Sequence, residues 1–174
     1  KKLDHNAPFK GHYFYMEKKL VDKLLSDDIV GEELLESIKA LLRSGDFLKA
    51  EQQLLDIVVA GPDHEEVLYM LAVCQRYLKK YSAALTNLDK LKSLVPDHSR
   101  GHQETGHVYR AMNNADAALN AYSRAIQINP ALLASFRAQI DILSATGRES
   151  GTGPLRRQLE SLEALPKVLV VVMD

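Results

Sequence analysis

A regular spacing of 34 residues is the feature that most limits how this chain can fold. Two residue types recur at that interval, three prolines and three alanines: Pro62, Pro96 and Pro130, and Ala50, Ala84 and Ala118. Repetition at a fixed period of roughly 20 to 50 residues is the signature of a stacked repeat protein, in which each unit buries its apolar face against its neighbours. The sequence therefore predicts an array of similar units rather than one globular core.

Within each period, further residues follow a known pattern. The unit that starts at Glu65 carries large, small, alanine and proline residues in a characteristic order: Leu68, Leu71, Ala72, Gln75, Ala84, Leu88, Leu91 and Pro96. Units that start at Gly31 and Ser99 fit the same register without a gap. In this pattern the sequence resembles the tetratricopeptide-repeat family. The resemblance implies an all-α fold, a right-handed α-α superhelical solenoid of helix-turn-helix repeats.

The register divides the chain into consecutive parts. The outer parts are an N-terminal arm with a capping helix, a degenerate fourth hairpin, and the start of a further unit or a truncated tail: 1–30, 133–165 and 166–174. Between them we expect three in-phase units, which together run from 31 to about Pro130: 31–64, 65–98 and 99–132.

Local signals agree with this register. Helix breaks between paired helices are expected at Gly45, at Lys79–Lys80 and at Asn113–Asn114, because glycine and asparagine suit the left-handed cap conformation. Asp63, with Glu66 three residues later, predicts an N-cap that opens the next helix.

The two ends leave alternatives open. Residues 16–26 have apolar residues at helical spacing and predict the capping helix, while residues 1–15 either pack on the array or are a remnant of an expression tag. Near 150 the sequence fits a longer turn or a deletion. The valine-rich run at 168–173 fits either the first helix of a further unit or a β-strand. If exposed, this run would favour self-association.

Composition narrows the function classes. The formal net charge of −1 favours neither nucleic acid nor an anionic membrane as a partner. The sequence has a single cysteine, no secretory leader and no apolar run of the roughly 20 residues that a membrane-spanning helix needs. We therefore expect a soluble, cytoplasmic protein.

The family resemblance places a peptide-binding groove along the first helices of the units. The candidate groove residues in this sequence are Tyr69, Arg76, Arg100, Gln103, His107, Arg110, Arg137 and Asp141. Arginine can hold a carboxylate through two hydrogen bonds, so an acidic protein segment is a candidate ligand. The alternative is that these charges only solvate an exposed face. The carboxylate-clamp variant of the family is disfavoured, since only Arg100 keeps even the charge type at its matching positions.

Other candidate sites are weak. His98 and His102 have a metal-compatible spacing but no third ligand, and Cys74 fits a small core residue. No catalytic motif, cofactor motif or metal site is found. We therefore predict a non-catalytic protein-interaction scaffold. The alternative is an N-terminal docking or regulatory region of a larger bacterial enzyme, since the style of the repeats resembles arrays that precede a sulfotransferase domain.

Overall fold

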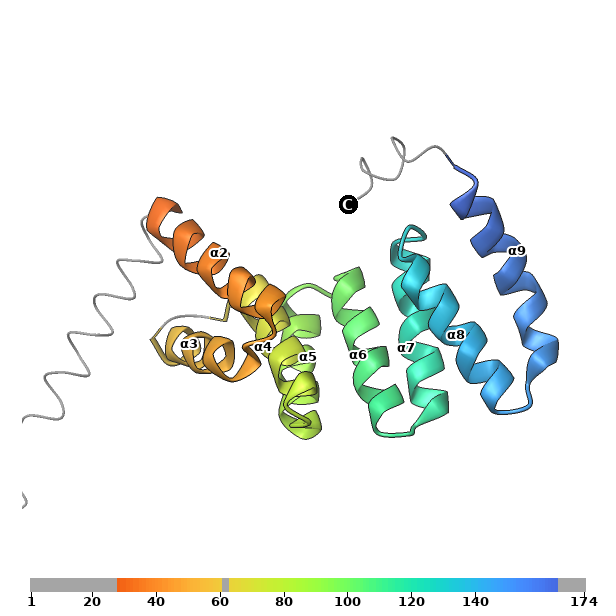
Figure 1. The fold of residues 1–174 in the computed structure, drawn as a ribbon, viewed down its shortest axis with the longest axis horizontal. Coiled ribbons are helices and arrows are strands. Elements are labelled where there is room, and N and C mark those ends of the chain that lie inside the picture. The colour runs from red at the N-terminus through yellow and green to blue at the C-terminus, as the bar shows by residue number, and fades with distance from the viewer. Residues whose placement is uncertain (1–27, 61–62, 166–174) are drawn as a thin grey trace, which may run out of the picture.

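The computed structural model describes residues 28–60 and 63–165, and every element in these ranges is helical. Eight α-helices form four antiparallel pairs, which follow one another in chain order along the long axis of the molecule (Figure 1). The pairs are α2 (Asp28–Ser44) with α3 (Phe47–Ala60), α4 (Glu65–Tyr77) with α5 (Tyr81–Leu94), α6 (Ser99–Ala111) with α7 (Ala115–Ile128), and α8 (Leu133–Ala145) with α9 (Thr152–Glu163). The prediction of an all-α array of hairpins is confirmed.

All four hairpins turn in the same way. The residue that ends each turn has a positive φ, between 59° and 80°, and these residues lie 34 apart: Gly45, Lys79, Asn113 and Gly147. In each turn the following amide donates to the carbonyl five residues back, as Lys80 does to Gln75 at 2.7 Å. This arrangement is the Schellman motif, which satisfies the last carbonyls of the first helix. The breaks expected from sequence therefore fall where the backbone adopts the left-handed conformation.

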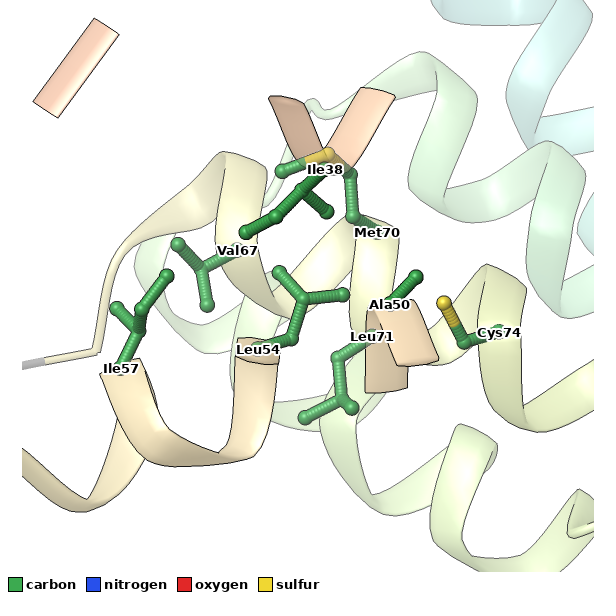
Figure 2. Packing of buried hydrophobic residues seen from close by; sticks show 8 residues of the cluster. All are labelled: Ile38, Ala50, Leu54, Ile57, Val67, Met70, Leu71 and Cys74. Carbon is green, nitrogen blue, oxygen red and sulfur yellow. The ribbon is translucent and has the colours of Figure 1, made fainter. Parts of the chain in front are cut away.

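The core runs between the hairpins as well as inside them. Figure 2 shows its first cluster, in which side chains of α2, α3 and α4 meet: Ile38, Ala50, Leu54, Ile57, Val67, Met70, Leu71 and Cys74. Leu68 on α4 belongs to the next cluster, with α5 and α6. Since successive faces of one helix serve different neighbours, each hairpin is stabilised by stacking. The burial of Cys74 confirms the core position expected from sequence.

The two helices of the third hairpin approach each other closely at Gly106. Gly106 on α6 faces the fully buried ring of Tyr122 on α7, and a Cβ at Gly106 would lie 2.6 Å from Cε1 of that ring. Only a residue without a side chain permits this approach. Tyr122 can therefore reach across α6 toward the opposite face of the array.

The structure corrects one predicted cap and locates the irregular fourth hairpin. The N-cap of α4 is His64, whose side chain accepts from the amide of Glu66, so the prediction of Asp63 is wrong. A short 3-10 helix (Glu149–Gly151) precedes α9. The predicted arm and capping helix before residue 28, and the tail from 166 onward, lie outside the described residues.

Candidate functional site

Polar side chains join the first helices of successive hairpins, and in the fourth hairpin they also join its two helices. Lys39 on α2 pairs with Glu66 on α4 at 2.7 Å. The series continues with Arg76–Glu104 from α4 to α6, and with Gln103–Ser135 at 2.9 Å and Arg110–Asp141 at 3.3 Å from α6 to α8. Arg137 on α8 pairs with Glu163 on α9 at 2.5 Å. We name this series the polar ladder. It brings together five of the predicted groove residues: Arg76, Gln103, Arg110, Arg137 and Asp141.

The Arg76–Glu104 pair is the most buried ion pair of the ladder. The Arg76 side chain is 20% exposed and the Glu104 side chain 5%. Burial raises the pKa of Glu104, and the Arg76 guanidinium partly offsets this rise. The guanidinium also lies 4.2 Å from the centre of the Tyr77 ring. Since Arg76 is occupied on both sides, it holds α4 and α6 together and is poorly placed to bind a ligand.

His107 is a neutral hydrogen-bonding group. The hydroxyl oxygen of Tyr122 lies 2.7 Å from its Nδ1. Burial, with the nearby charges of Arg76 and Arg110, lowers the pKa of His107 to about 4, and burial raises the pKa of Tyr122 to about 12. At neutral pH both groups are uncharged, so His107 can offer a ligand a hydrogen bond but no charge.

The two ion pairs that the ladder forms with α8 are accessible to solvent. Arg110 and Asp141 are 48% and 60% exposed, and Arg137 and Glu163 are 58% and 41% exposed. One guanidinium nitrogen of each arginine contacts its carboxylate. A guanidinium carries five N–H donors, so several remain available to a ligand in each pair. This part of the ladder can therefore bind a carboxylate or a backbone carbonyl.

The remaining predicted groove residues border this region. Tyr69 is half-buried on α4, its ring 5.6 Å from that of His98, and burial raises the pKa of its hydroxyl. Arg100 is exposed in the first turn of α6. Three partners in the ladder were not predicted as groove residues: Glu104, Ser135 and Glu163. Glu104 lies 28 residues after Arg76, which is one period less six residues, so the repeat spacing alone does not identify it as the partner.

The weaker candidates of the sequence have structural explanations. His98 Nδ1 accepts from the Gly101 amide, and His102 Nε2 lies 2.9 Å from the carbonyl oxygen of Pro96. No group of three metal-ligating side chains occurs in the described part of the chain. Burial raises the pKa of the Cys74 thiol to about 12, so it is a poor nucleophile. None of the described helices is both long and apolar enough to cross a membrane.

Comparison with known proteins defines the class to which this fold belongs. Residues 66–98 and residues 100–132 each match a sequence profile described as tetratricopeptide repeat. Together with the stacked hairpins, these matches show that the chain is a tetratricopeptide-repeat protein. Such repeats typically form non-catalytic scaffolds for protein interaction.

Solved structures of one particular protein share this fold. A crystal structure of MamA superimposes with a TM-score of 0.70 at 21% identity, over 94% of this chain and 96% of that chain. A structure of residues 41 to the end of MamA from Desulfovibrio magneticus RS-1 gives a TM-score of 0.68 at 15% identity, over 86% and 94% of the two chains. At these identities the similarity establishes the fold alone. Comparison with curated proteins gives no match by sequence. The alternative role as a docking region of a sulfotransferase has no support in these comparisons.

Proposed function

We propose that this protein is an interaction scaffold that holds an extended segment of a partner protein along the polar ladder, between α4 and α9. The observation that carries the proposal is the set of half-exposed side chains fixed in place by partners on neighbouring helices, above all Arg110–Asp141 between the third and fourth hairpins and Arg137–Glu163 within the fourth. Side chains already held by their neighbours lose less conformational entropy on binding than free ones. The ladder is therefore a pre-organised polar surface.

The preferred segment contains acidic residues as well as polar ones. Arg110 and Arg137 are both exposed, and each keeps guanidinium N–H donors beside the carboxylate that it already contacts. These donors favour a carboxylate, and therefore an acidic segment, as the ligand. Because the carboxylates of the ladder compete for the same donors, the preference is moderate and sensitive to salt. The cytoplasm is the compartment that we propose, on the ground that the single cysteine of the sequence is buried and cannot form a disulfide within the chain.

The test is binding of the full chain to an array of acidic and neutral peptides. Binding of Asp- and Glu-rich peptides should weaken by about thirtyfold in Arg110→Ala/Arg137→Ala, since two charge-assisted contacts are lost and each is worth roughly 1 kcal/mol. Asp141→Asn should instead strengthen binding, because it releases Arg110 from its internal partner. A matched control is Arg148→Ala: Arg148 is also exposed and paired, with Asp116 at 2.6 Å, but lies outside the ladder. Equal binding by the double variant and the control would refute the proposal.

A further inference from the structure

A cavity opens on the opposite side of the third hairpin from the polar ladder. Its volume is about 350 Å³, and helices α5, α6 and α7 line it. On α6 it is bordered by His102, Thr105 and Tyr109, whereas the ladder uses Gln103, Glu104 and Arg110 of the same helix. With 3.6 residues per turn, these two sets lie on opposite faces of α6. The cavity is therefore separate from the polar ladder. We name this cavity the convex pocket.

The convex pocket exists because two packing positions of the third repeat hold polar residues. Leu68 and Leu71 occupy the equivalent positions of the second repeat, where they are 0% and 1% exposed. In the third repeat these positions hold His102 and Thr105, both only half-buried. The Thr105 hydroxyl donates to the Gly101 carbonyl at 2.9 Å, and the His102 ring is held at the carbonyl of Pro96. Neither side chain fills the space that a leucine occupies at the equivalent position of the second repeat.

The pocket has apolar walls on α5 and α7, the polar side chains of His102 and Thr105 on α6, and charged side chains at its rim. Leu88 and Leu91 of α5 and Ala121 of α7 form apolar walls. The rim carries four polar side chains, two from α5 and two from α7: Asp89, Lys92, Asn120 and Arg124. Arg124 is bound to Asp97 at 2.7 Å, whereas Asp89 and Lys92 form no ion pair with other described residues. A ligand that matches this lining would bury an apolar group between the walls and would carry a basic and an acidic group that pair with the charged side chains of the rim.

We propose that the convex pocket receives one large apolar side chain, leucine, phenylalanine or tryptophan, from an amphipathic helix of a partner protein. A groove flanked by helices accepts a helix whose apolar side chain enters it. The volume lies within the range of about 300 to 1,000 Å³ that is usual for ligand pockets. Asp89 and Lys92, one turn apart on α5, select a helix with a basic and an acidic residue beside the anchor. This site gives the scaffold a second face, independent of the first.

The test uses side-chain mimics with the full chain. N-acetyl amides of tryptophan, phenylalanine, leucine and alanine are titrated while NMR reports the amide of Thr105 and the methyl groups of Leu88 and Leu91. The first three should bind with Kd values on the order of 1 mM, and the alanine amide at least about tenfold more weakly. Absence of saturable shifts for the three large amides would overturn the proposal.

Two variants fill the pocket from opposite walls, so that a folding defect in one leaves the other informative. Thr105→Leu restores the residue type of the second repeat, and Ala121→Leu adds bulk from α7; each should abolish binding and raise Tm. Gln127→Leu adds the same side chain to an exposed site on α7 and should leave binding unchanged. Unaltered binding in both filled variants would overturn the assignment. Octanoate binding at least about tenfold tighter than the tryptophan amide would also overturn it, since it would indicate a site for small amphiphilic anions.

Discussion

The contact between Gly106 and Tyr122 provides a sharp test of how the third hairpin is packed. In Gly106→Ala the new methyl group would lie 2.6, 2.7 and 2.8 Å from three carbons of the Tyr122 ring. Carbon atoms prefer separations of about 3.5 to 4.0 Å, so the ring or α6 must move by roughly 1 Å. Tyr122 is 0% exposed and hydrogen-bonded to His107, which leaves it little freedom to move.

Two opposing effects determine how much Gly106→Ala lowers the free energy of unfolding. Replacing glycine by alanine inside a helix stabilises it by about 1 kcal/mol. Overpacking a core costs about 1 to 3 kcal/mol, and contacts this short place the cost at the upper end. We therefore expect Gly106→Ala to lower the free energy of unfolding by about 2 kcal/mol, which urea denaturation followed by circular dichroism can measure.

A double-variant cycle separates the clash from other causes. In a Tyr122→Leu background the ring is gone, so Gly106→Ala should be neutral or stabilising, with a coupling of about 2 to 3 kcal/mol. Gly153→Ala in α9 is the control, because its Cβ would meet only the end of Arg157 at 3.6 Å. If Gly106→Ala were as stable as the wild type, or lost equal stability in both backgrounds, the packing argument would be refuted.

Two further predictions concern His107 and the turns. The pKa of His107 is about 4 in the folded chain and 6.5 in the unfolded chain, so its contribution to stability is complete above pH 6.5 and is lost as the pH falls toward 4. Between pH 7.5 and 4.5 the urea midpoint should therefore fall more steeply for the wild type than for His107→Gln. Parallel curves would contradict this. Lys79 has a φ of 59°, where the equivalent residues of the first and fourth hairpins are glycines, so Lys79→Gly should stabilise by about 0.5 to 1 kcal/mol. Lys80→Gly, at a φ of −87° and with loss of the contact to Glu51, should destabilise, and the same sign for both would argue against a backbone origin.

The hairpins could be predicted from sequence because each depends on local signals repeated in phase. The left-handed turn residue recurs every 34 positions, and the small residues that allow close packing recur with it. The caps were less predictable. Aspartate is a stronger N-cap by residue type, yet His64 and His98 cap α4 and α6, since the residue that directly precedes the helix determines which side chain reaches its free amides.

The polar ladder could be predicted only in part. Sequence places Arg76, Arg110 and Arg137 on one face, but their carboxylate partners lie 26 to 31 residues away. For Arg76 and Arg110 the partner is set by how one hairpin rotates on the next, and for Arg137 it is set by how α9 packs on α8. Both arrangements depend on the packed side chains between the helices. The groove therefore looked richer in available positive charge than the structure shows it to be.

The single-file order of the hairpins has a mechanical consequence. Because α4 packs on α3, α5 and α6, whereas α9 packs mainly on α8 and the short 3-10 helix before it, a displacement at α9 reaches α2 only through the hairpins in between. The compliances of the interfaces add in series, and the softest one governs how far the array bends. An interface with unfilled volume deforms more easily than a close-packed one. We therefore expect curvature changes to concentrate between α5 and α7, where occupation of the convex pocket would stiffen the hinge.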